Sequence, residues 1–341
     1  MLVPYALRAL APVNLGVRFH TTSSINMTLI IADHEQAVDP WQNVWAKSHE
    51  GKETKLAKDG LFAVADSVIT VMGSGGLTPI LSGHRKIHGI PIKLWKPYFV
   101  GEYFSSYLSP HFETECFMAF AGSTLTANHC LNLVSEHLSQ LRISYKRATT
   151  PLTPGTYFVQ RHCEYNILED PKASGRWSEN MFLDSDFEGI LTAEHIAQDV
   201  EHSLNKAVES ARKHSLSEDS LRSMHTDFLL GVHCPRNKTH HLFIYRMKAK
   251  LVEGVYELYM EREEIEEQKV AVLGLRKKFE YAAQAAMDTA LASGKSTGNA
   301  MFSFLNDAIT NITATGSFAI DRPAIHKHFN FGKLKKVQVT Q

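Results

Sequence analysis

The sequence predicts an α+β fold in which antiparallel sheets are covered on the outside by helices. Short apolar runs typical of strands come first, a long helical pattern follows, and strands and helices then alternate in blocks. Three consecutive strand-like segments with short links, 227–234, 241–251 and 255–263, indicate antiparallel neighbours. No repeated strand–helix–strand rhythm occurs, which argues against a doubly wound nucleotide-binding fold.

The N-terminal part of the predicted fold contains two strands separated by a polar segment. "TLIIA" (28–32) is a short apolar run that indicates a buried strand. The polar stretch 33–58 is interpreted as an insertion with a partly helical excursion. "LFAVADSVIT" (61–70) is predicted as the second strand. "GSGGLTP" (73–79) is predicted as a flexible loop, and because no lysine closes it, it is not a phosphate-binding loop.

The next predicted elements are strands at 84–95 and 116–122, followed by a helix over 123–147. The helix is predicted from the spacing of its apolar residues, and Ser123 or Thr124 is placed to cap it. The segment 84–95 reads as strand material, and 116–122 is an apolar run that ends at a glycine. The segment 84–147 is therefore predicted to form two strands followed by one helix with an N-terminal cap.

The C-terminal half is predicted to add helices and strands in turn. The region 148–218 begins loop-rich and then contains an amphipathic helix around "TAEHIAQDVEHSLNKAVESARKHS". Helices are predicted at 276–294, where Gly294 ends the pattern, and at 300–312. The segment 325–340 closes the chain as strands.

Composition excludes several classes of protein. The 341 residues include 36 Lys plus Arg and 36 Asp plus Glu, so no net charge attracts nucleic acid or acidic lipid. No stretch approaches the roughly 20 apolar residues of a membrane span. The four cysteines are far apart and form no CxxC pair, which favours a reducing compartment over a disulfide framework. These cysteines are Cys116, Cys130, Cys163 and Cys234.

The first residues differ in composition from the rest. "MLVPYALRALAPVNLGVRFHTTSSIN" contains Arg8 and Arg18 and no acidic residue, which suits a mitochondrial transit peptide or a propeptide. A misassigned start, with translation beginning at Met27, is the third interpretation. Residues 1–27 are thus expected to be a leader, propeptide or misassigned start. Because arginines are sparse, we expect a cytoplasmic protein, with a mitochondrial location as the alternative.

A histidine-rich segment raises the question of a metal site. His233, Cys234, His240 and His241 flank "PRNKT". Their spacing fits no standard zinc site, and the segment reads as a turn between two strands. We therefore expect no metal and no cofactor.

Four short motifs, in this order, resemble those of the proteasome beta-subunit-like N-terminal nucleophile (Ntn) hydrolase family. They are "MTLIIA", "DGLFAVADSVIT", "RKI" and "FAGS", the last leading into a helix. The resemblance covers about a fifth of the chain. It implies a four-layer αββα sandwich of two antiparallel sheets flanked by helices. It also implies one proteasome-like domain over 28–341, with insertions at about 33–58 and 148–218.

The resemblance further implies roles for four residues. Thr28 is the nucleophile, once it is the first residue of the chain, and its α-amine is the base. Lys86 lowers the pKa of the amine, and Asp66 holds the lysine. Gly122 is the oxyanion donor. Arg85 is the alternative to Lys86 as the cation, although the pattern of a lysine before an apolar residue favours Lys86.

This chemistry has a physical basis that does not depend on the resemblance. A threonine hydroxyl is a poor nucleophile until a base removes its proton. An α-amine has a pKa of about 7.7–8.0 and can act as that base near neutral pH. A nearby ammonium lowers the pKa of the amine. A backbone N–H beside the scissile carbonyl stabilises the developing oxyanion.

The sequence also departs from the family pattern. Val68 stands where the family has an arginine after "ADS", and Met27 precedes Thr28 where a glycine is usual. The later turn that carries an auxiliary serine falls at Gly274, which is followed by Leu275. These departures leave room for a catalytically inactive relative.

The leading functional hypothesis is therefore a threonine-type peptidase or amidase that forms an acyl-enzyme through Thr28. The alternative is a catalytically inactive proteasome-like structural or binding subunit. A third hypothesis, a metal-dependent hydrolase that uses the histidines, predicts inhibition by a chelator. The expected partners are a peptide or protein substrate and further copies of the chain, with 276–294 as a candidate interface. The sequence does not identify an ATPase partner and indicates neither nucleic acid nor membrane as a partner.

Overall fold

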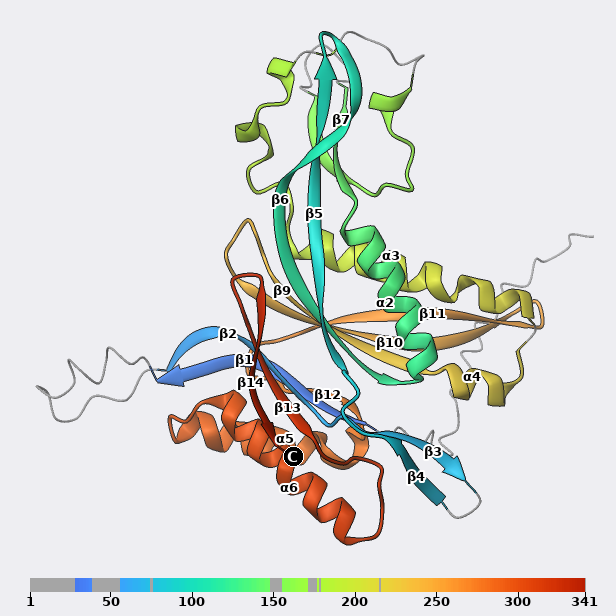
Figure 1. Cartoon of the computed structure of the whole chain (residues 1–341), viewed down its shortest axis with the longest axis vertical. Helices are drawn as coiled ribbons and strands as arrows, with labels where there is room; N and C mark the ends of the chain where they lie inside the picture. Colours follow the sequence, from blue (N-terminus) through green and yellow to red (C-terminus); the bar gives the residue numbers. More distant parts are fainter. Residues whose placement is uncertain are drawn as a thin grey trace, which may run out of the picture.

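The structure is a computed structural model that describes residues 28–38, 56–73, 76–147, 155–170, 177, 179–214 and 216–340. Within these ranges the chain forms five α-helices, two large sheets and a separate two-stranded sheet (Figure 1). The α+β class predicted from the sequence is confirmed. The predicted leader 1–27 lies outside the described residues.

The first sheet has five strands and is antiparallel throughout. Helices α5 (Arg276–Ala292) and α6 (Thr297–Ala314) pack on one of its faces. They contact alternate side chains of the sheet, such as Leu29 and Ile31. In spatial order, the strands are β12 (Ala271–Gly274), β1 (Leu29–Val38), β2 (Leu56–Ala65), β13 (Ala324–Asn330) and β14 (Lys333–Thr340).

The second sheet has seven strands and is mixed, because β5 and β7 pair in parallel while the other neighbours are antiparallel. Helices α2 (Thr124–Leu138) and α3 (Ala193–Glu209) pack against it, and the short α4 (Glu218–Met224) leads into β9. In spatial order, the strands are β11 (Val255–Ile265), β10 (His240–Val252), β9 (Thr226–His233), β6 (Tyr103–Gly122), β5 (Ile87–Val100), β7 (Leu141–Lys146) and β8 (Thr156–Gln160).

A third apolar cluster joins the two sheets. It contains Ile30 and Ala32 from β1, Ala119 from β6 and Leu229 from β9, and all four side chains are buried. Successive side chains of a strand point to opposite faces, so β1 sends Ile30 toward the second sheet and Leu29 toward the helices. This double burial explains why the β1 sequence begins as a continuous apolar run.

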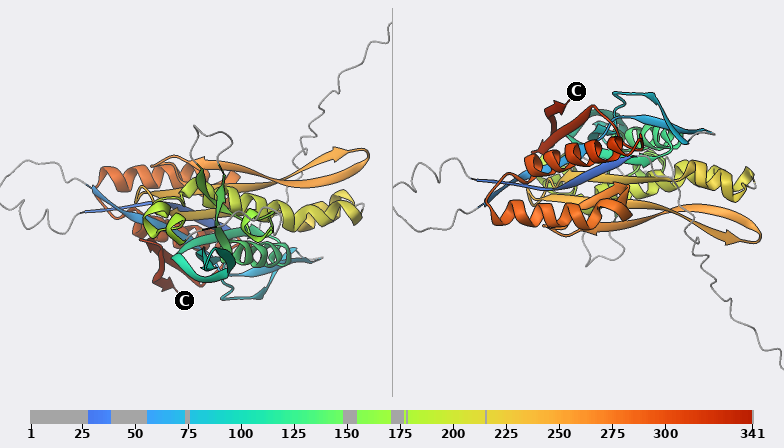
Figure 2. Two further views of the ribbon diagram at one scale, coloured as in Figure 1. Left: turned by 90° about the horizontal axis from the view of Figure 1, so that it is seen from above. Right: turned by 90° about the horizontal axis from the view of Figure 1, so that it is seen from below.

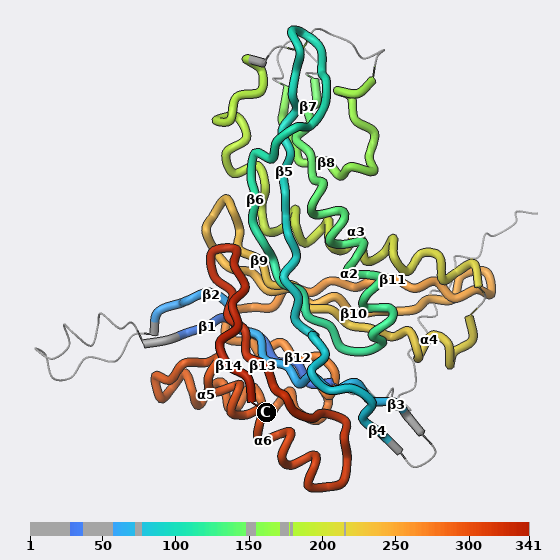
Figure 3. The backbone as a smooth tube through the Cα atoms, viewed as in Figure 1, coloured from blue at the N-terminus to red at the C-terminus, as the bar shows by residue number. Residues whose placement is uncertain are grey.

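Three hairpins extend beyond the packed body. The long β5–β6 hairpin forms an arm at the top of Figure 1, with β7 beside it. This hairpin contains all the residues between Lys86 and Gly122. The β10–β11 hairpin extends to one side (Figure 2), and the short hairpin of β3 (Ile69–Gly73) and β4 (Gly76–Leu81) projects near the opposite end from the arm (Figure 3).

The polar segment 33–58 was wrongly predicted to begin an insertion directly after a short first strand. The first strand does not end at residue 32 but continues to Val38, and the segment 56–58 pairs with it as part of β2. The polar residues 33–36 stay in the strand because they gain partners: Glu35, for example, accepts hydrogen bonds from Ser296 Oγ and the Gly298 N–H. The proposed helical excursion otherwise falls at 39–55, outside the described residues.

The predicted strand 61–70 is broken, and the predicted loop 73–79 is largely a strand. The chain leaves β2 after Ala65 and begins β3 at Ile69. The break occurs where the Asp66 carboxylate accepts backbone N–H groups in place of a neighbouring strand. β4 then pairs with β3 in antiparallel fashion, while residues 74–75 lie outside the described part.

The helix predicted over 123–147 ends early. α2 stops at Leu138, and β7 then pairs in parallel with β5. Leu141 and Ile143 are both buried at the two-residue spacing of a strand. Leu141 also continues the helical spacing of the apolar residues before it, so the sequence pattern did not show where the helix ends. Of the two predicted caps, Ser123 is the N-cap, and its side chain accepts from the Thr126 N–H.

The remaining predicted elements are present. β9, β10 and β11 are consecutive antiparallel strands, and α5, α6 and the closing β13–β14 hairpin match the predicted segments. Within 148–218 the described residues add β8 and α3, with three short 3₁₀ helices between them: Ile167–Glu169, Glu179–Met181 and Asp184–Phe187. A fourth, Ser210–His214, follows α3. The sequence analysis did not predict the short strand β12. No helix in the described ranges is long and apolar enough to cross a membrane.

Candidate active site

Three of the four residues predicted for the site lie together. Thr28 directly precedes β1, Asp66 directly follows β2, and Lys86 directly precedes β5. The Lys86 ammonium donates to Thr28 Oγ1 at 3.0 Å and to Asp66 Oδ2 at 2.8 Å. Because β1 and β2 are antiparallel neighbours, the start of one strand and the end of the other meet at the same edge. The fold thus joins three distant points of the sequence.

Asp66 also holds the backbone at the start of β1. Its Oδ1 accepts the Leu29 N–H at 2.9 Å, and its Oδ2 accepts the Val68 N–H at 3.3 Å. The Asp66 N–H in turn donates to the Leu29 carbonyl at 3.3 Å. One carboxylate therefore fixes the residue after Thr28, the turn after β2 and the lysine.

The three side chains are buried, which changes their acid–base properties. Thr28 is 6% exposed, Lys86 4% and Asp66 1%. Burial lowers the pKa of Lys86 and raises the pKa of Asp66, while the ion pair between them opposes both shifts. For Lys86, burial outweighs the carboxylate, so its pKa lies below the ordinary 10.5 of a lysine. The ammonium is therefore easier to deprotonate than a surface lysine.

Arg85, the alternative cation, lies exposed on the surface. The side chain that contacts both Thr28 and Asp66 is that of Lys86. Of the two adjacent basic residues, Lys86 is therefore the one at the centre of the cluster.

Gly122 lies at the end of β6, one strand away from the lysine. The Phe120 N–H donates to the Lys86 carbonyl at 3.2 Å, and alternate N–H groups of a strand point to the same side. The Gly122 N–H therefore points toward the Lys86 side. Gly122 has φ +130°, and a Cβ there would lie 2.2 Å from the His225 carbonyl oxygen, so only glycine fits.

The prediction missed His84 as a neighbour of the site. Its N–H donates to the Ser67 carbonyl at 2.9 Å, and its ring packs edge-on against Phe120 at 5.9 Å. Burial, and then the charge of Lys86, lower the pKa of the imidazole. The only sequence signal was the basic run "HRKIH", which is also typical of a solvated surface.

The turn at Gly274 and Leu275 also reaches Thr28. The Leu275 N–H donates to the Thr28 carbonyl at 2.8 Å. In the sequence this turn stood out only because it has a leucine where a serine was expected. The contact is made by the backbone, so no residue type at position 275 could have revealed it.

The histidine-rich segment forms the turn that the sequence indicated. β9 ends at His233 and β10 begins at His240, and these two residues face each other across the strands with ring centroids 4.7 Å apart. Within the described ranges, no group of three or more His, Cys, Asp or Glu side chains is placed to hold a metal ion.

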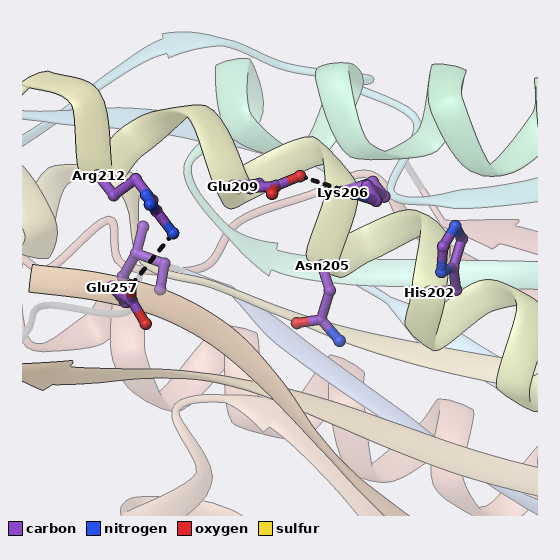
Figure 4. A pocket seen from close by; sticks show the side chains of 7 residues that line it. His202, Asn205, Lys206, Glu209, Arg212 and Glu257 are labelled. Carbon is purple, nitrogen blue, oxygen red and sulfur yellow. Dashed lines mark hydrogen bonds and ion pairs between the residues drawn. The ribbon is translucent and has the colours of Figure 1, made fainter. Parts of the chain in front are cut away.

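Two pockets formed by described residues lie away from Thr28. One, of about 300 Å³, lies between α3 and β11 and is lined by charged side chains that pair with each other, Lys206 with Glu209 and Arg212 with Glu257 (Figure 4). The other, of about 680 Å³, lies along α5 and α6. Neither pocket is lined by the residues of the Thr28 cluster.

The chemistry open to the Thr28 cluster follows from its contacts. A cation that donates a hydrogen bond to a hydroxyl oxygen stabilises the alkoxide form of that hydroxyl. The carboxylate behind the lysine keeps the ammonium aimed at the oxygen. The cluster can therefore favour an alkoxide at Thr28, provided that a base accepts the proton.

Comparison with known proteins gave matches only among solved structures. No family model matches the sequence, and no curated protein matches it. The chain is similar to the Anbu (Gly-1) mutant from Hyphomicrobium sp. strain MC1, with 11% identity over 92% of this chain and 87% of that chain and a TM-score of 0.36. It is also similar to Anbu from the same strain, with 12% identity over 92% and 86% of the two chains and a TM-score of 0.32.

Proposed function

We propose that this protein is a threonine-type peptidase or amidase of the proteasome-like Ntn hydrolase kind, built as a four-layer αββα sandwich over 28–341. Thr28 is the nucleophile and its α-amine is the base. The observation that carries the proposal is the hydrogen bond from Lys86 to Thr28 Oγ1, made within a buried ion pair with Asp66. Burying an ion pair costs free energy, so a buried pair aimed at a hydroxyl favours a chemical role.

In the first step, the neutral α-amine of Thr28 takes the proton from Oγ1, and the oxygen attacks the carbonyl carbon of a peptide or amide. The C–O bond forms as the carbonyl π electrons move to oxygen. The Lys86 ammonium stabilises the developing charge on Oγ1, and the Gly122 N–H stabilises the charge on the carbonyl oxygen. The protonated amine then gives its proton to the leaving nitrogen as the C–N bond breaks.

In the second step, water releases the acyl group from Thr28. The α-amine takes a proton from the water, whose oxygen attacks the ester carbonyl. The tetrahedral intermediate collapses with return of the proton to Oγ1, which gives a carboxylic acid and restores the threonine. No metal or cofactor takes part in this scheme.

The mechanism requires an active chain whose first residue is Thr28. The test determines the N-terminus of the purified protein by intact mass. The protein is then treated with a peptide epoxyketone, which reacts with both the hydroxyl and the α-amine of an N-terminal threonine. We expect one adduct on Thr28 and none on Thr28→Val, which keeps the side-chain shape but lacks the hydroxyl. A folded chain that begins at Thr28 and forms no adduct contradicts the proposal.

A second candidate is a catalytically inactive proteasome-like structural or binding subunit. It is favoured by the 6% exposure of Thr28 and by Leu275 in place of a serine. This candidate predicts that the purified chain keeps residues before Thr28 and that Thr28→Val changes neither assembly nor binding.

Assembly and location belong to the same proposal. We propose a cytoplasmic homo-oligomer that acts on peptide or protein substrates, with α5 as a candidate interface helix. Light scattering coupled to size-exclusion chromatography tests the oligomer. A mitochondrial location is the alternative if residues 1–27 direct import.

A further inference from the structure

The peptide group between Thr28 and Leu29 makes a hydrogen bond through both its carbonyl and its N–H. The carbonyl of Thr28 accepts the Leu275 N–H at 2.8 Å, and the N–H of Leu29 donates to Asp66 at 2.9 Å. Carbonyl and N–H belong to the same planar unit, so two hydrogen bonds on opposite sides fix the orientation of that plane. The Cα of Thr28 lies in this plane, so its position is fixed together with the plane, while Lys86 contacts its hydroxyl.

The close approach of the turn depends on glycine at position 274. Gly274 lies opposite Leu29 in the pairing of β12 with β1, and it has φ +82°, a conformation that favours glycine. A Cβ at this position would lie 1.8 Å from the Thr28 carbonyl oxygen and 2.6 Å from its carbonyl carbon. Both atoms belong to the backbone, so a side chain at 274 forces the Thr28 peptide to move.

We propose that the turn of Gly274 and Leu275 is a positioning element that aims the Thr28 nucleophile, which deepens the proposed function and rests on it. The turn sets the plane of the peptide after Thr28, and Asp66 sets the same plane from the other side. Asp66 also holds Lys86, which contacts Thr28 Oγ1. The turn and Asp66 therefore hold the backbone of Thr28, while Lys86, held by Asp66, contacts its hydroxyl. If the turn moves, Oγ1 shifts relative to the Lys86 ammonium.

A purely structural role for Gly274 makes a different prediction. In that case glycine only allows the chain to pass from β12 into α5, and its replacement lowers stability without changing the reactivity of the folded protein. Misplacing a reacting atom by about 1 Å can cost on the order of 100-fold in rate, whereas loss of stability alone does not change the rate per folded molecule. Reactivity per folded molecule therefore separates the two roles.

Two other glycines provide matched controls for Gly274→Ala. Gly60 has φ +87°, and a Cβ there would lie 2.2 Å from the Phe329 carbonyl oxygen, so Gly60→Ala combines the same strain with a similar clash elsewhere. Gly254 has φ +81° with no neighbouring atom within 4 Å, so Gly254→Ala adds the backbone strain alone. Leu275→Pro is a second test variant, because it removes the N–H while φ is −70°, a value that proline adopts.

The experiment measures acylation of the full chain by a peptide β-lactone, with the maximal rate separated from the probe's binding constant and corrected for the folded fraction. We expect Gly274→Ala and Leu275→Pro to lower the maximal rate at least 10-fold with little change in probe binding. Gly60→Ala is expected to lower stability but to keep the rate of the unchanged protein. Gly254→Ala is expected to keep the rate as well.

The possible outcomes are distinct. Equal rates for the unchanged protein and the folded Gly274→Ala and Leu275→Pro variants overturn the positioning role but leave the proposed function intact. A similar loss of rate in Gly60→Ala also overturns it, because the effect is then not specific to the turn. If the unchanged protein is not acylated when its chain begins at Thr28, the proposed function and the positioning role both fail.

Discussion

The Nζ of Lys86 lies 3.0 Å from Oγ1 of Thr28, although 58 positions separate the two residues in the chain. The contact forms because the start of β1, the end of β2 and the start of β5 meet at one place. Asp66 supplies the third corner at 2.8 Å from the same nitrogen. One buried ammonium therefore contacts both the Thr28 hydroxyl and the Asp66 carboxylate.

Removal of that cation is expected to destabilise the fold. Lys86→Met keeps an unbranched side chain but leaves the Asp66 carboxylate buried without its partner, and breaking a buried pair in this way costs about 3–5 kcal/mol. The double variant Asp66→Asn/Lys86→Met removes both charges, so we expect it to regain most of the loss. Urea unfolding of both variants measures these free energies.

A double variant as unstable as Lys86→Met alone would contradict this account. The destabilisation would then come from lost packing of the lysine side chain and not from an unpaired carboxylate. Lys58→Met is the matched control, because Lys58 pairs with Glu267 on the surface and its loss is expected to cost at most about 1 kcal/mol.

The acylation rate is expected to follow a bell-shaped pH profile. The rate rises with pH as the Thr28 amine loses its proton, at or below the usual pKa of about 8, because the base must be neutral. It falls again as Lys86 loses its proton, at a pKa that burial holds below 10.5. In Lys86→Arg the cation persists beyond about pH 12, so the alkaline fall should disappear. An unchanged alkaline fall in a folded Lys86→Arg variant assigns it to another group.

The Gly122 N–H is expected to stabilise the oxyanion. Replacement of Gly122 by glycolic acid turns its amide into an ester and removes the N–H without adding a Cβ. We expect the acylation rate to fall by roughly 100- to 1,000-fold, the usual effect of losing one such donor. The same replacement at Gly254 is the control and should leave the rate unchanged. A rate within about threefold of the unchanged protein at position 122 would show that the donor lies elsewhere.

Buried His326 is expected to make stability depend on pH. It is 3% exposed, lies between Phe62 and Phe302, and burial, followed by the charge of His328, lowers its pKa to about 4. The unfolded chain binds this proton near pH 6.5, so stability is lost as pH falls from about 6.5 to about 4, by at most about 3 kcal/mol. His326→Leu should reduce this slope in urea unfolding, and the same change at exposed His214 should not. Identical slopes for His326→Leu and the unchanged protein would contradict the prediction.

The parts of the fold that follow local patterns could be predicted from the sequence. The spacing in 276–294 and the three strand-like segments after 227 gave elements that the structure contains. Their patterns are long or repeated, and their boundaries coincide with Gly294 and with short turns. The α+β class follows from the order of these blocks.

The parts set by distant partners could not be predicted. Asp33 to Gln36 were interpreted as the start of a polar insertion, yet they are buried in β1, where α6 supplies hydrogen bonds to Glu35 and Gln36. The residues 141–146 continue the spacing of α2, but their pairing with β5 makes them a strand. In both cases the deciding contacts come from residues far away in the sequence.

The candidate site shows the same division. Thr28, Asp66 and Lys86 could be singled out because their motifs occur in family order, and the three side chains lie together. His84 and the turn at Gly274 gave no comparable signal, since both reach the site through packing or backbone contacts. Contacts made by the backbone do not restrict which residue type occupies a position, except where only glycine fits.

The central claim is that the α-amine of Thr28 is the base for its own hydroxyl. The most direct measurement compares β-lactone acylation of two folded chains, one that begins at Thr28 and one that keeps Met27 in front of it. We predict rapid acylation of Thr28 in the first chain and none in the second, because an amide nitrogen cannot accept the proton. Equal acylation of both chains would contradict the claim.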